Sequence, residues 1–563
     1  MKKLFFALAL IFGTAAANAQ ANFAADSIAL KTWYHQDFEK TGVYGVGTDD
    51  ALAFLKSKGL KPSPIVVGVI DSGVQITHPD LQNNIWTNLK EIAGNGIDDD
   101  RNGYIDDIHG WDFIGGKDGK DVDIDTYEKA RIVAQYQPIF EGNDSSKNKA
   151  AQAKQPKEFQ EYLRAKVDYD KTWNKAKNNL EDIQASKERV SMMIMVLKQG
   201  LEGKPLTEDN INAASFIEPQ LKEFFLQMAQ NPGLAGKTAD EIQKEADEQL
   251  DEAEKYYSTQ LKQLDLTLDT RAIVGDDYSN LTQIDYGNNE VEGPDALHGT
   301  HVSGIIAAER NNNIGMDGIA GDVAKILVVR AVPDGDERDK DIANAIFYAV
   351  DNGAKVINMS FGKDYSPNKE RVWEAMKYAE KKGVLMVHAA GNDNKFVDKE
   401  INFPTNFKDN ENKSFVNNWI TVGASTRYND NLKASFSNYG KEKVDIFAPG
   451  LEIYSTVNGS KYRFLQGTSM ASPVVAGCAA LLWAYFPELT AVQVKDILMK
   501  TANKSTAPVI AGGEEENINS PKIETTFDQL SVSGGVVDVY KAVKHAYEHY
   551  GPTTAKSGKK GKN

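Results

Sequence analysis

The stretch FLQGTSMASPVVAGCAALL, residues 464–482, places a serine where a glycine-containing segment leads into an apolar, helix-like run. A residue at a helix N-terminus faces unpaired backbone N–H groups and the positive end of the helix macrodipole, and both stabilise a developing anion. Ser469 is therefore a candidate nucleophile for acyl transfer. Serine is also a common helix cap, so this stretch alone leaves a capping role for Ser469 or Ser472 open.

A candidate acid and a candidate base occur earlier in the chain. Asp71 ends the β-branched run VVGVI, and His298 opens the helix-like run HGTHVSGIIAA. In open parallel sheets, functional groups gather at the carboxyl ends of the strands, where such residues can meet. Each residue alone also fits a structural role, as a turn former, a helix-start residue or a cap. Their joint occurrence in the order Asp, His, Ser, with glycine close to each, favours a catalytic set.

The elements that must position these residues can be traced along the chain. Residues from about 61 to 116 and from about 270 to 548 alternate strand-like runs with turns and helical segments. We therefore expect an α/β fold, with a mostly parallel sheet and helices on both faces. The expected strands include PIVVGVID, AKILVVRAV, KVINMSF, GVLMVHAAG and NWITVGA, and the expected helices include DIANAIFYAVDNG and ERVWEAMKYAEKKG.

Residues from about 120 to 269 have a different character, being charged, poor in glycine and helical in pattern. One apolar stripe at helical spacing consists of Leu180, Ile183, Val190, Ile194 and Leu197. A second stripe runs from Ile242 to Leu268, and Thr238 with Glu241 supplies its capping box. Prolines between the stripes indicate at least two long helices, which would form an antiparallel hairpin. This large all-α insertion interrupts one domain rather than following it.

The segments that contain these three residues resemble those of a known protein family. VIDSGV, HGTHVSG and GTSMASPVVAG are similar to the three signature segments of the subtilases, the subtilisin-like serine peptidases of family S8, in the same chain order. The resemblance covers roughly residues 44–116 and 270–548. It implies a subtilisin-like fold and a serine endopeptidase, in which Ser469 attacks the scissile carbonyl, His298 transfers the proton and Asp71 orients the imidazole.

The resemblance also implies roles for further residues. Asn392 in VHAAGNDN matches the family's oxyanion asparagine, and His301 is interpreted as structural because the first His of the motif acts in the family. The substrate-binding residues would be Ser360, Phe361 and Gly362, which match the segment whose exposed edge pairs with an extended substrate. The family often has a smaller side chain at the place of Phe361, so the size preference of the pocket stays open.

A group of candidate metal ligands lies in NGIDDDRNGYIDD. Its oxygen donors are Asp98, Asp100, Asn102, the Tyr104 carbonyl and Asp106, with Gly103 at the sharp turn. Hard oxygen ligands at this spacing suit a structural Ca²⁺ ion. Position 12 of the loop is His109 rather than Glu, so a complete EF-hand is not expected, and an acidic surface turn is the alternative.

The start and the charge of the chain indicate its compartment and partners. MKKLFFALALIFGTAAANAQA has a basic start, a short apolar run and the ending Ala17-Asn18-Ala19, as in a cleavable secretory signal. We expect an exported protein, periplasmic or secreted, with no membrane span in the mature chain. The net charge of −16 argues against a nucleic-acid partner. The single cysteine, Cys478, has no disulfide partner in the chain and is expected to be a buried small hydrophobe.

The chain is therefore expected to divide into a signal peptide (1–19), an N-terminal extension with the start of the catalytic domain (20–60), two parts of the catalytic domain (61–119 and 270–548), the helical insertion (120–269) and a basic flexible tail (549–563). The expected partners are protein or peptide substrates. We interpret the insertion as an arm or lid that gates substrate access or docks a protein partner. A binding or chaperone-like protein, with the catalytic fold as scaffold, is the alternative.

Overall fold

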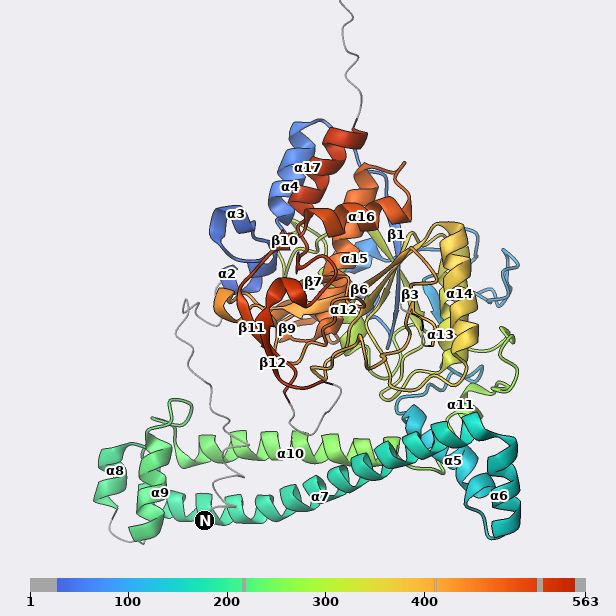
Figure 1. The fold of residues 1–563 in the computed structure, drawn as a ribbon. Coiled ribbons are helices and arrows are strands. Elements are labelled where there is room, and N and C mark those ends of the chain that lie inside the picture. The colour runs from blue at the N-terminus through green and yellow to red at the C-terminus, as the bar shows by residue number, and fades with distance from the viewer. Residues whose placement is uncertain (1–27, 215–218, 410, 412, 514–519, 552–563) are drawn as a thin grey trace, which may run out of the picture. The chain divides into compact units, whose positions relative to one another are not determined.

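The computed structural model describes residues 28–214, 219–409, 411, 413–513 and 520–551 (Figure 1). The described chain forms two compact units, a helical unit of residues 129–268 and a sheet unit on either side of it in the sequence. Residues 120–128, which the sequence analysis assigns to the insertion, belong to the sheet unit. The physical reason is that Arg338 binds Asp125 there, with 2.7 Å between Nε and Oδ2. The predicted signal peptide and residues 552–563 of the predicted tail lie outside the described residues, whereas residues 549 and 550 are the end of the last helix, Val539–Tyr550, instead of the start of the tail.

The sheet unit is built on a nine-stranded sheet with the order β10-β13-β7-β6-β5-β4-β1-β3-β2. The strand bounds are β1 Ile65–Asp71, β2 Gly110–Asp112, β3 Ala324–Arg330, β4 Val356–Met359, β5 Leu385–Ala389, β6 Trp419–Ser425, β7 Ile446–Pro449, β10 Asn503–Lys504 and β13 Gly535–Val536. Every neighbouring pair is parallel except β10 and β13. The predicted α/β fold with a mostly parallel sheet is confirmed.

Helices cover both faces of this sheet, which explains why its strands are nearly continuous apolar runs. Along β3, Ile326 and Val328 enter one hydrophobic core, whereas Leu327 and Val329 enter the other. The first core includes α4 Thr48–Ser57, α12 Leu297–Ala307, α15 Thr468–Tyr485, α16 Ala491–Thr501 and α17 Val539–Tyr550, and the second includes α13 Asp339–Asp351 and α14 Lys369–Lys382. The predicted helices DIANAIFYAVDNG and ERVWEAMKYAEKKG correspond to α13 and α14.

The segment before β1 is an integral part of the sheet unit. It forms α2 Ile28–Lys31, η1 Trp33–His35, α3 Phe38–Thr41 and α4. Trp33 and Tyr34 are fully buried in the first core, and Trp33 Nε1 donates a hydrogen bond to the carbonyl of Glu452 at 3.0 Å. Because α4 also packs against α17, residues 28–60 contribute to the same core as the central sheet.

The helical unit consists mainly of two long helices, α7 Pro156–Leu201 and α10 Ala239–Gln263. Shorter helices complete it: α5 Glu128–Phe140, which begins in the sheet unit, α6 Ser145–Lys154, α8 Glu208–Ala213 and α9 Pro219–Ala229. On α7, Tyr169, Lys187 and Lys198 contact residues 264, 251 and 240 in turn. The residue numbers of the partners decrease as those on α7 increase, so the two helices are antiparallel.

The apolar stripes of the sequence meet inside this unit. Val190, Ile194 and Leu197 of α7 pack in one core with Ile242 of α10. The capping box of Thr238 and Glu241 is present at the start of α10. The helix ends at Gln263 rather than at Leu268, because the Asp265 carboxylate accepts the backbone N–H of Thr267 and favours a turn over a further helical turn.

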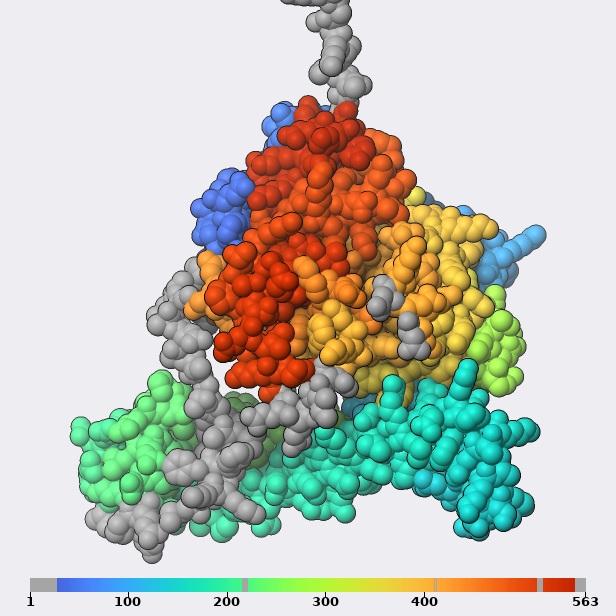
Figure 2. Space-filling view, viewed as in Figure 1, coloured from blue at the N-terminus to red at the C-terminus, as the bar shows by residue number. Residues whose placement is uncertain are grey.

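The remaining elements are short: η2 Gln82–Asn84, α11 Arg271–Val274, η3 Asn429–Asn431, η4 Phe527–Gln529 and the hairpins of β8 Ile453–Val457 with β9 Lys461–Leu465 and of β11 Pro508–Ala511 with β12 Ile523–Thr526. The β11–β12 hairpin lies on the outside of the sheet unit (Figure 2). Among the described residues, α15 alone is long and apolar enough to cross a bilayer by composition, and 89% of that stretch is buried inside the protein. Cys478 on α15 is buried, as predicted.

Candidate active site

Asp71 and His298 form a hydrogen-bonded pair at the end of β1. Asp71 is the last residue of β1 and 2% exposed, and His298 lies in the first turn of α12. His298 Nδ1 lies 2.7 Å from Asp71 Oδ1, and the same oxygen accepts the backbone N–H of Ser72 at 2.8 Å. The bond at Nδ1 fixes the ring orientation and leaves Nε2 for proton transfer.

Ser469 lies in the first turn of α15, close to the end of β4, which is a neighbour of β1 in the sheet. Its Oγ donates to the carbonyl of Ser360 at 3.0 Å, and Ser360 Oγ donates back to the Ser469 carbonyl at 2.9 Å. Ser360 follows β4, and β4 pairs with β1 so that Met359 lies beside Ile70. Asp71 and Ser360, each one residue further on, therefore end neighbouring strands, and this register brings the Asp71–His298 pair and Ser469 to one edge of the sheet.

Asn392 follows β5, the next strand along the sheet, and Thr468 fixes its carboxamide. The backbone N–H and the hydroxyl of Thr468 both donate to Asn392 Oδ1, at 2.8 and 3.0 Å. Thr468 Oγ1 accepts the Gly391 N–H at 3.1 Å, and Thr468 is fully buried. With Oδ1 occupied, Nδ2 is directed away from Thr468, and no acceptor for it is found in the described part of the chain. Asn392 Nδ2 and the first-turn N–H of Ser469 are thus available donors.

The two histidines of HGTHVSG have opposite environments. Burial lowers the pKa of His298, but the Asp71 carboxylate, with a smaller contribution from Asp295, outweighs this effect and leaves the pKa above its ordinary value. His301 is fully buried, and burial lowers its pKa to about 3. His301 Nε2 lies 3.1 Å from the carbonyls of both Ile453 and Arg463, so the ring donates to β8 and β9 as a neutral group. Of the two, only His298 faces an acid.

The segment Ser360, Phe361 and Gly362 continues from β4 past Ser469. Ser360 is 3% exposed, Phe361 is half-buried and Gly362 is exposed. A Cβ atom at Gly362 would lie 2.8 Å from the carboxamide of Asn402, so a larger residue there would have to displace that side chain. The exposed backbone beside Ser469 offers an edge along which an extended chain can pair.

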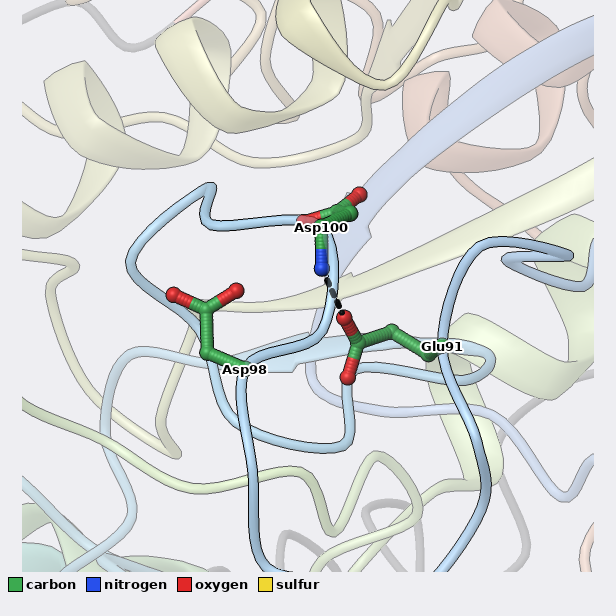
Figure 3. A group of neighbouring side chains, drawn as sticks. All are labelled: Glu91, Asp98 and Asp100. Atoms are coloured by element: carbon green, nitrogen blue, oxygen red, sulfur yellow. Dashed lines mark hydrogen bonds between the residues drawn. The ribbon is translucent and has the colours of Figure 1, made fainter.

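The structure brings together some of the predicted metal ligands and adds one. Asp98 and Asp100 lie with Glu91, and ligand oxygens of the three are within 4.8 Å of one another (Figure 3). Glu91 is 8% exposed and accepts the Asp100 N–H at 2.9 Å. Asn102 adjoins the group, because its backbone N–H donates to Asp98 and Asp100, both at 3.1 Å.

One predicted carboxylate ligand is directed differently. The Asp106 carboxylate accepts the N–H groups of Asn95 and Gly96, at 3.2 and 2.8 Å, instead of joining the three-carboxylate group. The Tyr104 side chain is buried and its N–H donates to Asn102 Oδ1 at 2.8 Å, while its carbonyl, the predicted donor, stays a prediction. The sequence interpretation missed Glu91, because it precedes the spaced motif and reaches the group only through the fold of the loop. It also missed Thr468 as the residue that orients Asn392.

A mostly parallel sheet, an acid–imidazole pair at a strand end and a serine at the start of a buried helix, in the order Asp, His, Ser, are typical of the subtilisin-type class of serine hydrolases. The chain belongs to the subtilase family: the model for Peptidase_S8, described as Subtilase family, matches residues 63–518.

Curated relatives agree with this assignment. "Thermophilic serine proteinase" of Bacillus sp. (strain AK1) is 44% identical over 208 residues, covering 37% of this chain and 47% of that protein. "Cell wall-associated protease" of Bacillus subtilis (strain 168) is 38% identical over 231 residues, covering 41% and 24%. "Thermitase" of Thermoactinomyces vulgaris is 39% identical over 254 residues, covering 44% and 75%. The chain thus spans about half of the first relative's length and a quarter of the second's.

Proposed function

We propose that the protein is an exported serine endopeptidase that hydrolyses peptide bonds in proteins through Asp71, His298 and Ser469. The observation that carries the proposal is the 2.7 Å contact between Asp71 and His298 at the strand edge where Ser469 also lies. Membership of the subtilase family supports the reaction class. The printed name of the cell wall-associated relative supports a location outside the cytoplasm, either periplasmic or secreted.

The residues would act in sequence on a bound peptide. The Ser469 hydroxyl turns from the Ser360 carbonyl to His298 Nε2, loses its proton there and attacks the scissile carbonyl carbon. The tetrahedral oxyanion accepts hydrogen bonds from the Ser469 N–H and Asn392 Nδ2. The peptide C–N bond breaks as His298 gives the proton to the leaving amine, and water then hydrolyses the acyl-enzyme by the same route in reverse. Asp71 holds the imidazole and stabilises its cationic form.

The segment Ser360, Phe361 and Gly362, which becomes exposed at Gly362, would hold an extended substrate by main-chain hydrogen bonds, and such bonds depend little on the substrate's side chains. Such binding suits unfolded segments of many proteins. Phe361 would border the bound substrate, and its half-buried ring packs near the buried His388 ring, with 6.4 Å between the two centroids.

A structural Ca²⁺ ion would be held by Glu91, Asp98 and Asp100, with Asn102 beside them. These residues fit such an ion, because three carboxylates with oxygens within 4.8 Å of one another repel, and a divalent cation among them would offset this repulsion more fully than the backbone N–H groups and the Lys90 ammonium, 3.8 Å from Asp100, do. The ion would supply stability and no chemistry. We further propose that the helical unit, which has its own core, limits the access of large substrates or docks a protein partner.

The test is hydrolysis of a denatured protein and of a short chromogenic peptide by the purified mature chain, with Ser469→Ala as control. We expect activity towards both substrates that disappears in Ser469→Ala and after treatment with a serine-directed phosphonylating reagent. A folded protein that cleaves neither substrate and does not react with the reagent would overturn the proposal and favour a binding protein on a catalytic scaffold.

A further inference from the structure

Arg330 is a buried cation beside the catalytic acid of the proposed function. It ends β3, and the register of β1 with β3 pairs Asp71 directly with Arg330. The side chain is only 2% exposed. A buried guanidinium is costly unless its N–H groups are satisfied, so its partners show what the side chain holds in place.

Three nitrogen atoms of Arg330 reach three different segments of the sheet unit. Nε donates to the carbonyl of Ser72 at 2.9 Å, in the turn that follows Asp71. Nη1 donates to Asp112 Oδ2 at 2.6 Å, at the end of β2, and Nη2 donates to the carbonyl of Val122. The planar fork of arginine allows these directions at once, which a lysine ammonium on a single flexible stem does not match.

The contact with Ser72 connects Arg330 to the acid itself. The Ser72 N–H donates to Asp71 Oδ1 at 2.8 Å, and His298 Nδ1 meets the same oxygen. Both backbone polar groups of Ser72 are thus hydrogen-bonded: its carbonyl accepts from Arg330, and its N–H donates to Asp71. The Asp71 carbonyl is also fixed, by the N–H groups of Ala331 and Val332 at 3.0 and 3.2 Å, directly after Arg330.

The surroundings leave the Arg330 side chain little freedom. Gly293 has φ +69°, and a Cβ atom there would lie 2.1 Å from Arg330 Nε, so the chain leading to His298 passes directly over the guanidinium. Gly73, the next residue after Ser72, has φ +122°, and a Cβ atom there would lie 2.1 Å from the Glu292 carbonyl oxygen. The turn after Asp71, Arg330 and the segment before His298 therefore pack as three contacting layers.

We propose that Arg330 is a positioning residue for catalysis: through Ser72 it fixes the Asp71 carboxylate in the orientation that holds His298. This inference rests on the proposed function. A purely structural role, in which Arg330 only neutralises the fully buried Asp112, would make the Ser72 contact irrelevant to turnover.

The test compares Asp112→Asn with the double variant Arg330→Met, Asp112→Asn. Both variants lack the buried Arg330–Asp112 ion pair. Only the double variant also lacks the hydrogen bond from Arg330 to Ser72. The double variant retains neither the Arg330 nor the Asp112 charge. We expect kcat of the double variant to fall about 10- to 100-fold below that of Asp112→Asn, with KM for a short peptide changed less than about twofold, because small misplacements of catalytic groups have effects of this size. The proton NMR resonance of His298 Nδ1–H should shift or broaden only in the double variant.

Equal kcat and an equal resonance in the two variants would overturn the proposal. If the double variant does not fold, Arg330→Lys is the second variant. It keeps the charge opposite Asp112 and should still show the loss of kcat and the altered resonance. A wild-type chain without Ser469-dependent hydrolysis would overturn the proposed function instead, and the resonance would then still decide whether Arg330 positions the Asp71–His298 pair.

Discussion

At the scale of single residues, the proposed centre depends on neighbours that hold its groups without taking part in the chemistry. Thr468 orients Asn392, Ser72 donates to Asp71, and Ser360 exchanges hydrogen bonds with Ser469. Preorganised donors of this kind stabilise a transition state because they need not reorganise when charge develops. If the proposed centre is catalytic, loss of such a contact should lower kcat.

The first prediction concerns Asn392. Asn392→Ala removes the side-chain donor proposed for the oxyanion, so kcat should fall by about 10²–10³ with little change in KM, the magnitude known for removal of such a donor in subtilisin, a member of this family. Steady-state kinetics on a short peptide measures the change. The matched control is Asp393→Ala, an exposed neighbour that should change kcat by no more than about threefold. A loss as complete as that of Ser469→Ala would contradict a role limited to the oxyanion.

The second prediction concerns Asp295, an exposed carboxylate three residues before His298 that contributes to its raised pKa. Asp295→Asn removes this charge, so the pKa of His298 should fall. Because the proposed base must be neutral to accept a proton, activity should persist to lower pH, and the acidic limb of the kcat/KM profile measures this shift. The difference should shrink at about 1 M salt, which screens exposed charges.

Glu488→Gln is the matched control for Asp295→Asn. Glu488 is also exposed, but it follows the C-terminal end of α15, whereas Ser469 is at its start. An acidic limb that moves equally in both variants would mean that net charge, rather than the local field of Asp295, sets the profile.

At the scale of elements, the central strands could be predicted because burial on both faces leaves a continuous apolar run that is independent of distant partners. The end of α10 and the ligand group around Glu91 could not be predicted in the same way. A side-chain turn at Asp265 competes with the helix, and Glu91 joins Asp98 only when the intervening loop folds back. Arg330 was missed for a related reason, because a strand-end arginine in the sequence gives no sign that three segments will cover it.

The third prediction tests the carboxylate loop. If it binds a structural Ca²⁺ ion, a chelator should lower the melting temperature by about 3 °C. Removing a ligand present at about 100 times its Kd costs about 2.7 kcal/mol, and a sheet unit of about 400 residues unfolds with an entropy of roughly 0.85 kcal/mol/K. Glu91→Gln should show a lower melting temperature in calcium and a much smaller response to chelator. Asp118→Asn, at an exposed acid outside the loop, should keep the full response. A melting temperature that neither chelator nor Glu91→Gln changes would contradict calcium binding.

At the scale of the whole molecule, the chain combines two units with separate hydrophobic cores. Composition alone indicated this division, because the charged, glycine-poor stretch contrasts with the α/β pattern on either side. The position of the first junction was less accessible to sequence, since residues 120–128 are polar yet are held by buried ion pairs in the sheet unit, as between Glu128 and Lys363 at 2.8 Å.

A buried arginine of the sheet unit also keeps the two ends of the insertion close together. The Arg338 guanidinium donates to Asp125 Oδ1 at 3.0 Å and to Thr270 Oγ1 at 3.2 Å. The Arg338 side chain thus contacts both the segment that precedes the helical unit and the segment that follows it. We therefore expect that a short Gly/Ser linker in place of residues 129–268 leaves the sheet intact, since loop length has only a small effect on stability.

The last prediction uses this deletion. A variant lacking residues 129–268 should fold and should cleave a short peptide at a rate within about twofold of the intact chain, because the proposed catalytic residues and their partners all lie in the sheet unit. If the helical unit restricts large substrates, the ratio of protein to peptide hydrolysis should rise several-fold, and Ser469→Ala in the deleted chain should abolish both activities. The control variant Lys187→Ala, Lys198→Ala weakens the α7–α10 contacts while it keeps the unit present, and it should leave the ratio close to that of the intact chain. A folded deletion variant with an unchanged ratio would remove the gating role and leave partner docking as the remaining role of the unit.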